Sequence, residues 1–313
     1  MPTWSKILTE VQVAVAEGRS VDSVRRKYLK ILHDFTRRNI ILYATAFTQK
    51  GGPSELLSIT EEDIQGMMEV VYGLEKNKPV DFIIHSPGGS PEAAEGIVNY
   101  LHEQFGNNIR VIVPQIAMSA ATMIACSGKS IVMGKHSSIG PIDPQLIINT
   151  PSGITSNPAK AIIDQFYKAL LEMNQKDKQA WSILLKQYGP SLISQCENYI
   201  EMSEKSVKQW LKQYMFDEDL EKEKKSEVIS KYLADHDNFK SHGRHISRKL
   251  AEEIGLKIEY LEEIPDFAND PKNQQKFQDL ILSVFHSTTL TFQSTRAMKI
   301  IENHNGSAFI KII

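Results

Sequence analysis

Short apolar runs alternate with stretches of helical periodicity along the first half of the chain. The apolar runs are rich in β-branched side chains, which predicts buried strands at 40–47, 80–85, 109–114 and 130–133. Between them apolar residues recur at every third or fourth position, which predicts helices at 61–75, 92–105 and 118–126. This alternation indicates an α/β fold of βαβ units, with a mostly parallel sheet covered on both faces.

Two segments outside this region have a purely helical pattern. Residues 1–38 carry apolar side chains at helical spacing and predict an N-terminal amphipathic helix. Residues 158–235 contain long amphipathic stretches, a Gly189-Pro190 break and a highly charged end from 201 to 235. We predict that residues 158–235 form a helical insertion on the surface.

The remaining segments complete the predicted core. A short helix is expected at 247–254, with Gly255 as its C′ residue, and an apolar helix or strand at 277–292. Together with the strands above, these segments assign residues 39–157 and 236–313 to one core domain.

The composition is that of an ordinary globular protein of 313 residues. With 36 basic and 38 acidic residues, the net charge of −2 gives no long-range attraction to nucleic acid or to an anionic membrane. The two cysteines, Cys126 and Cys196, do not make a disulfide framework. The N-terminus lacks the apolar core of a signal peptide, and no run approaches the ~20 apolar residues of a membrane span. These features predict a cytoplasmic protein without a transmembrane segment.

The sequence predicts neither a metal nor a cofactor. His236, His242 and His245 lie close together, but no further Cys or His residues complete a ligand set. A Gly-x-Gly-x-x-Gly motif and a Walker loop are both missing, so we expect no ATPase activity from this chain.

Two glycines, Gly88 and Gly89, follow a predicted buried strand and precede a predicted helix, in the sequence Ser86-Pro87-Gly88-Gly89. Glycines at such a junction allow a close approach of the backbone, and their N–H groups can face a developing negative charge. A plain tight turn is the alternative interpretation.

Ser119 stands at the start of a helix made of small residues, Ala120-Ala121-Thr122. Small neighbours permit a crowded strand-to-helix junction of the kind that exposes a nucleophilic serine, although the Gly-x-Ser-x-Gly motif is not present. Serine is also a common helix N-cap, and this is the alternative.

Considered together, the two junctions favour a functional interpretation of both. They lie about 30 residues apart, and in a parallel sheet with right-handed crossovers both open at the same carboxyl edge, where ligand sites collect. The glycine turn would then supply one oxyanion donor and the N–H of Ala120 another. Ser119 Oγ would be the nucleophile.

Three segments in this order resemble the Clp/crotonase superfamily: Phe-Ile-Ile-His-Ser-Pro-Gly-Gly-Ser at 82–90, Ala-Met-Ser-Ala-Ala-Thr at 117–122 and Ser-Ile-Gly-Pro-Ile-Asp-Pro-Gln at 138–145. Within it the chain is most similar to the serine dehydrogenase proteinase family, which is related to the signal peptide peptidase A type. The resemblance spans residues 40–150 and returns at 241–256 and in the tail at 299–310. It implies a crotonase-like spiral of βαβ units, a serine-peptidase active site and ring-like homo-oligomers.

The resemblance offers a histidine base in two arrangements. Clp proteases place it about 25 residues after the serine, where this chain has Asp143 without a histidine, and His136 is interpreted as an exposed loop residue. The order Ser-Asp-His proposed for the most similar family maps to Ser119, Asp143 and His242. That family reads His-Asp where this chain has His242-Gly243, so a solvent-facing loop histidine is the alternative.

The third candidate base is a lysine, as in the signal peptide peptidase A type. Lys160 lies 41 residues after Ser119, at the start of a predicted helix, which matches the position of the lysine in those relatives. A lysine must be neutral to accept a proton, and burial near Ile162 and Ile163 would lower its pKa. A solvated lysine is the alternative.

Three functions remain open from the sequence. The first is a serine endopeptidase that acts on peptides or unfolded proteins through an acyl-enzyme on Ser119. The second is a catalytically inactive oligomeric scaffold, motivated by Gly243 in place of the acid. The third is acyl-CoA chemistry, which the serine and the lack of an adenine or pantetheine site disfavour.

Overall fold

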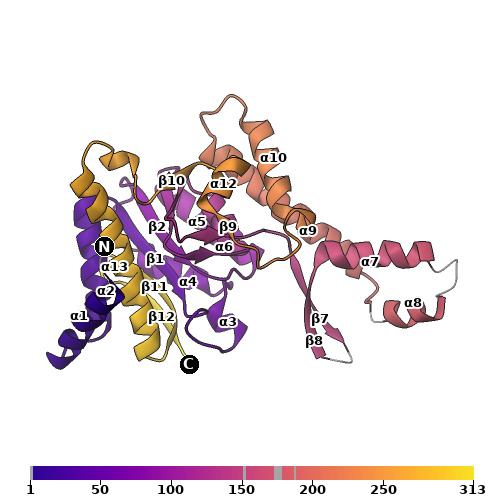
Figure 1. Ribbon diagram of the computed structural model, residues 1–313, viewed down its shortest axis with the longest axis horizontal. Coiled ribbons are helices and arrows are strands. Elements are labelled where there is room, and N and C mark those ends of the chain that lie inside the picture. Colours follow the sequence, from indigo (N-terminus) through magenta and orange to yellow (C-terminus); the bar gives the residue numbers. More distant parts are fainter. Residues whose placement is uncertain (1–2, 151–152, 173–177, 187) are drawn as a thin grey trace.

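A seven-stranded sheet forms the centre of the computed structural model, which describes residues 3–150, 153–172, 178–186 and 188–313 (Figure 1). The strand order is β10-β5-β3-β2-β1-β11-β12. Its parallel part comprises β1 (Asn39–Thr45), β2 (Val80–His85), β3 (Ile109–Val113), β5 (Ser130–Met133) and β10 (Ile258–Tyr260). The C-terminal hairpin of β11 (Ala297–Asn303) and β12 (Ala308–Ile312) adds two antiparallel strands beside β1.

Helices cover both faces of the sheet because its strands carry apolar side chains on both. Ile40 and Leu42 of β1 face α2 (Asp22–Thr36) and α13 (Pro271–Ser294), whereas Ile41 faces the opposite core. On that opposite face lie α4 (Asp63–Val71), α5 (Pro91–Phe105), α6 (Ala120–Cys126) and α12 (Arg248–Ile254). The α/β fold and the four strands predicted from the apolar runs are confirmed, and the segment at 277–292 is a helix.

The N-terminal segment, predicted as one helix, forms two. These are α1 (Trp4–Ala16) and α2, and Gly18 in the turn between them has a φ of +79°. The pair packs on α13, and the fully buried Arg25 of α2 donates to the carboxylate of Glu302 on β11. This segment is therefore joined to the core by a buried ion pair as well as by apolar contacts.

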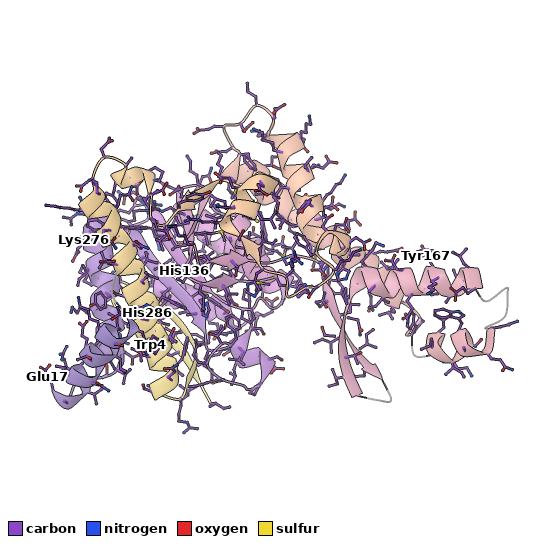
Figure 2. All side chains as sticks on the ribbon, viewed as in Figure 1. Trp4, Glu17, His136, Tyr167, Lys276 and His286 are labelled. Atoms are coloured by element: carbon purple, nitrogen blue, oxygen red, sulfur yellow. The ribbon has the colours of Figure 1, made fainter. Side chains whose placement is uncertain are left out.

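Residues 145–150, 153–172 and 178–185 project from the core as an arm (Figure 1). The arm contains the hairpin of β7 (Gln145–Thr150) and β8 (Gly153–Pro158), followed by α7 (Ala159–Glu172) and α8 (Lys178–Leu185). Tyr167 on α7 is half exposed (Figure 2). Residues 173–177 and 187 of the predicted helical insertion lie outside the described residues.

The charged end of the predicted insertion packs on the main core. It comprises α9 (Leu192–Trp210), the π-helical turn η1 (Leu211–Met215) and α10 (Lys222–Ala234). Val207, Leu211 and Met215 are fully buried in the same apolar cluster as the sheet strands. Charged side chains of these helices are largely exposed, whereas their apolar side chains pack on the core.

Several short elements complete the chain. A small three-stranded sheet holds β4 (Ile116–Ala117), β6 (Ser138–Ile139) and β9 (Ile246–Ser247) in the order β4-β6-β9. The short helices are α3 (Ser54–Leu57), α11 (His236–Phe239) and the 3₁₀ turn η2 (Pro265–Phe267). In the parts of the chain that the structure describes, no helix combines the length and the apolar character that crossing a membrane requires.

Two buried histidines give the fold an expected sensitivity to acid. Burial lowers the pKa of His85, and burial together with the neighbouring His33 lowers that of His304, in both cases to about 4 from 6.5. Between pH 6.5 and 4 the unfolded chain therefore binds protons that the folded chain does not. We expect the free energy of unfolding, measured by urea denaturation, to fall from pH 7 to pH 4.5 by about 2 kcal/mol per histidine. An unchanged free energy of unfolding over this interval would contradict the assignment.

Candidate active site

Ser119 occupies a strained position at the junction between β4 and α6. Its φ is 51° and its ψ is −122°. The other described non-glycine residues with a positive φ, Arg37 and Lys240, are in the left-handed helical region, but Ser119 lies outside it. Such a conformation costs on the order of 1–3 kcal/mol. The side chain is at the N-cap position but accepts no capping hydrogen bond. The helix-cap interpretation of this serine therefore fails, and its hydroxyl is left for another use.

The glycine turn contacts this serine directly, as the sequence predicts. Gly88 has a φ of +102°, and a Cβ at this position would lie 2.7 Å from Ser119 Cβ and 3.0 Å from Ala120 N. Gly89 has a φ of +150°, and its Cβ would lie 2.3 Å from Ile59 O. A residue with a side chain would displace backbone atoms at either position, so both positions of the turn require glycine.

Two backbone N–H groups at this contact have no acceptor. The carbonyl of Gly88 accepts from Ile59 N at 2.7 Å, and because the trans peptide is planar, the N–H of Gly89 points away from Ile59. The N–H of Ala120 begins α6 and cannot be satisfied within its own helix. Across the described residues neither N–H donates a hydrogen bond within the protein. The N–H of Gly88, by contrast, donates to Ser86 Oγ at 3.2 Å.

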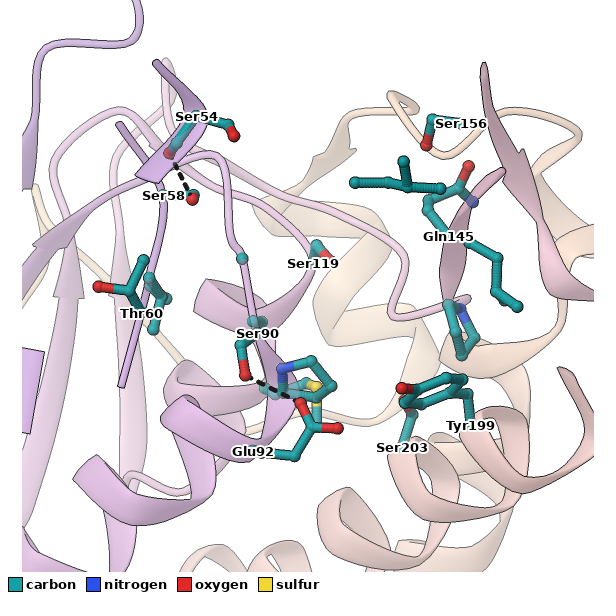
Figure 3. A pocket seen from close by; sticks show the side chains of 18 of the residues that line it. Ser54, Ser58, Thr60, Ser90, Glu92, Ser119, Gln145, Ser156, Tyr199 and Ser203 are labelled. Carbon is teal, nitrogen blue, oxygen red and sulfur yellow. Dashed lines mark hydrogen bonds between the residues drawn. The ribbon is translucent and has the colours of Figure 1, made fainter. Parts of the chain in front are cut away.

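Ser119 opens into a pocket of about 660 Å³. Figure 3 shows the serine between a wall that carries Ser58 and Ser90 and a wall that carries Gln145 and Tyr199. Apolar side chains contribute much of the lining: Ile59, Met123, Ile142, Leu146, Ile147 and Leu192. The charged side chains among the described lining residues are all acidic: Glu55, Glu61 and Glu92.

Asp143 lies beside this pocket, between the lining residues Ile142 and Pro144, and it holds two histidines. It is buried, with Oδ1 2.7 Å from His242 Nδ1 and Oδ2 2.8 Å from His236 Nδ1. Gln145 Nε2 also donates to Oδ2, at 3.1 Å. Because a carboxylate only accepts, both Nδ1 atoms are the donors in these hydrogen bonds. In the neutral tautomer that donates from Nδ1, Nε2 is the acceptor.

The structure brings Asp143 and His242 together, as the Ser-Asp-His order requires. The sequence did not single out His236 as a partner of Asp143. The only signal for it was its proximity to His242 along the chain, which was weighed for metal binding. Within the described chain, no set of three or more His, Cys, Asp or Glu side chains is arranged to hold a metal ion.

Lys160 does not have the environment that a lysine base needs. Its side chain is 38% exposed and forms ion pairs with Asp164 and, at 3.8 Å, with Asp237. The hydrogen bond to Asp164 raises the pKa of Lys160, against the lowering expected from burial near Ile162 and Ile163. That expectation was wrong because the apolar side chains of α7 point elsewhere: Ile162 is buried in a small cluster of the arm.

Ser119 Oγ makes no hydrogen bond with His242, His236 or Lys160 in the regions that the structure describes. Hydrogen bonds of a catalytic serine are often long in unliganded enzymes and tighten when substrate binds. His136 is exposed, as predicted, and His245 is engaged through Nδ1 with Ser138 Oγ at 2.6 Å. The catalytic roles of Ser119, Asp143, His242 and Lys160 stay predictions.

The central sheet, the small second sheet and the serine at the β4–α6 junction define a ClpP-like fold. The chain belongs to the ClpP-like SDH-type serine proteinases, since the sequence profile of that family matches residues 57–266. The predicted relationship to the serine dehydrogenase proteinase family within the Clp/crotonase superfamily is thereby confirmed.

Two proteins of Methanocaldococcus jannaschii are similar in sequence. The protein named Uncharacterized protein MJ0137 is 29% identical over 201 residues, which are 64% of this chain and 60% of that protein. Uncharacterized protein MJ1495 is 30% identical over 142 residues, which are 45% of this chain and 44% of that protein. The matched regions thus span about half of each relative's length.

Among solved structures, the 1510-N membrane-bound stomatin-specific protease, in a mutant form, matches 47% of this chain and 80% of its own. It is 20% identical, with a TM-score of 0.27.

Proposed function

We propose that this protein is a serine endopeptidase in which Ser119 forms the acyl-enzyme. The observation that carries the proposal is the strained backbone of Ser119, which places an uncapped hydroxyl at the wall of a pocket beside two N–H groups without acceptors. Gly89 and Ala120 are then the oxyanion donors. Gly88 is the less suitable donor because its N–H already donates to Ser86.

His242 is the proposed general base, and Asp143 orients it. The support is geometric, because Asp143 Oδ1 fixes the proton on His242 Nδ1 and so leaves Nε2 free. Gly243 does not leave the histidine without an acid, since Asp143 takes that place from a distant part of the chain. His236 shares the same carboxylate and is the second candidate for the base.

The reaction then follows the acyl-transfer sequence. As the bond between Ser119 Oγ and the substrate carbonyl carbon forms, the hydroxyl proton passes to His242 Nε2 and the carbonyl oxygen becomes an oxyanion held by the N–H groups of Gly89 and Ala120. His242 returns the proton to the amine as the C–N bond breaks. Water then attacks the acyl-enzyme and gives a proton to His242, and His242 passes it to Ser119 Oγ as the ester C–O bond breaks. The carboxylic acid product and the free serine hydroxyl are released.

An extended peptide is the proposed substrate. Among the described residues β7 pairs only with β8, and its residues Gln145 and Ile147 line the pocket. The outer edge of β7 therefore offers backbone groups to a substrate strand. The apolar lining suits apolar side chains of an unfolded segment. The carboxylates of Glu55, Glu61 and Glu92 favour cationic residues over acidic ones near the scissile bond.

Assembly of several copies is also proposed. Large apolar side chains are exposed on the arm, among them Ile147, Ile154, Leu171 and Ile183, with exposed fractions from 65% to 76%. Exposed apolar surface of this kind marks interaction sites. It supports the homo-oligomer that the family resemblance implies.

The test of the base compares His242→Ala, His236→Ala and Lys160→Met. We expect His242→Ala to lower kcat for a fluorogenic peptide by at least about 100-fold, since general-base catalysis contributes 10²–10⁴-fold. Lys160→Met is expected to leave kcat unchanged because its amine is charged and paired outside the pocket. His136→Ala, in an exposed loop, is the control. A loss confined to Lys160→Met would assign the base to the lysine instead.

A further inference from the structure

A buried charged cluster lies behind the glycine turn. Lys299 of β11, Asp63 at the start of α4 and Tyr43 of β1 are each fully buried. Lys299 Nζ lies 2.6 Å and 2.7 Å from the two carboxylate oxygens of Asp63, and Tyr43 Oη donates to Oδ2 at 2.8 Å. The proposed mechanism uses none of these groups.

The cluster holds the backbone on both sides of Ile59. Lys299 Nζ donates to the carbonyl of Ser58 at 2.7 Å, and Asp63 Oδ2 accepts from Thr60 N at 2.9 Å. Lys299 and Asp63 thus hold the segment 58–60 directly, and Tyr43 supports it through its hydrogen bond to Asp63. The segment follows the four-residue helix α3.

Ile59 in turn fixes the glycine turn. Its N–H donates to the carbonyl of Gly88 at 2.7 Å, and its carbonyl accepts from Ser90 N at 3.0 Å. Because the peptide between Gly88 and Gly89 is planar, the position of the Gly88 carbonyl sets the direction of the Gly89 N–H. The close contact of Gly89 with Ile59 leaves little room for the turn to shift in that direction.

We propose that Lys299 and Asp63 are positioning residues, which aim the N–H of Gly89 at the oxyanion through Ser58, Ile59 and Thr60. This proposal rests on the proposed function of Ser119, and it explains what holds the Gly89 N–H of the oxyanion hole in its direction. Neither side chain reaches the pocket, since neither is among its lining residues. A buried ion pair contributes little net stability compared with apolar groups of similar size, so its use here is the orientation of two backbone groups.

The experiment replaces the cluster by apolar groups of similar shape in the triple variant Tyr43→Phe, Asp63→Leu, Lys299→Met. This variant leaves no buried charge unpaired. Ser58 and Thr60 are half-buried, so water can hydrogen-bond the Ser58 carbonyl and the Thr60 N–H that lose their partners. We expect a folded protein whose kcat for peptide hydrolysis falls about 100-fold with KM unchanged, as when one oxyanion donor is lost. The rate at which a fluorophosphonate probe labels Ser119 falls in parallel.

Glu302→Gln is the matched control because Glu302 lies on the same strand and forms a buried ion pair with Arg25, away from the glycine turn. We expect it to lower the unfolding temperature and to leave kcat unchanged below that temperature. Should the triple variant not fold, the double variant Asp63→Asn, Lys299→Met is measured instead, because it also leaves no buried charge unpaired and keeps the shape of Asp63. The same fall in kcat at constant KM is expected.

A folded cluster variant with the kcat of the wild type would overturn the proposal, as would an equal fall in kcat for Glu302→Gln. These outcomes differ from a failure of the proposed function itself. In that case the wild-type protein shows no hydrolysis that depends on Ser119, whatever the state of the cluster.

Discussion

Replacement of Ser119 by alanine is expected to abolish peptide hydrolysis, with kcat reduced by roughly 10⁶-fold, as for the loss of the nucleophile in other serine peptidases. The physical reason is that Ser119 is the residue whose Cβ lies against Gly88, next to the N–H of Ala120, and alanine has no hydroxyl to attack the carbonyl carbon. The fold is expected to remain, because Ser119 Oγ makes no hydrogen bond that the variant would lose among the described residues. Hydrolysis of a fluorogenic peptide and the thermal unfolding temperature measure the two effects.

Ser20→Ala is the control for this variant. Ser20 is exposed in the turn between α1 and α2 and does not line the pocket, so its substitution should leave kcat unchanged. Peptide hydrolysis that survives in Ser119→Ala at a comparable rate would exclude Ser119 as the nucleophile. A wild-type protein that cleaves no unfolded substrate and takes up no probe would favour the inactive scaffold.

Substitution Asp143→Asn is expected to have the second largest effect, a decrease in kcat of about 10⁴-fold. At Oδ2 two donors, His236 Nδ1 and Gln145 Nε2, converge, so the carbonyl oxygen of the new amide is favoured there. The amide NH₂ group then faces His242 Nδ1 and requires that atom to accept. The proton of His242 moves to Nε2, and this atom can no longer take the proton of Ser119.

The pH dependence of hydrolysis and the kcat of Asp143→Asn test this account of the tautomer. Asp164→Asn is the control, since Asp164 is a carboxylate paired with Lys160 at the surface of α7. A kcat for Asp143→Asn within ten-fold of the wild-type value would show that Asp143 does not orient the base.

The strands and the glycine turn could be predicted from the sequence because each depends on residues that are adjacent along the chain. A buried parallel strand is a continuous apolar run, and β2 begins and ends at the predicted residues, 80 and 85. The proximity of Ser119 to Gly88 followed from topology, because parallel strands with crossovers of one hand open at one edge. The fold class was predicted on these grounds and on the family resemblance.

The environment of each candidate base depends on contacts between distant parts of the chain, which no local pattern records. Asp143 meets His236 and His242 across more than 90 residues. The lysine-base hypothesis required Lys160 to be buried near its neighbours in sequence, but its side chain is part-exposed and pairs with Asp164 and Asp237. The hydrogen bond from Lys299 to Ser58 joins residues 241 positions apart, so it could not be predicted from the sequence either.

The composition of the charged segment 201–235 did not predict how the segment packs. Its many charges indicated a surface insertion, whereas the apolar residues at helical spacing within it determine how it packs. A narrow apolar stripe suffices to dock a helix, since burial of each large side chain contributes about 1.5–3 kcal/mol. The charges then occupy the remaining, solvated face.

The most direct test of the central claim is a crystal structure of the protein after reaction with a fluorophosphonate that mimics the tetrahedral intermediate. We predict a covalent bond from Ser119 Oγ to phosphorus, with the phosphoryl oxygen within about 3 Å of both Gly89 N and Ala120 N. An adduct on a different residue, or a phosphoryl oxygen that lies away from these two N–H groups, would contradict the assignment of the active site.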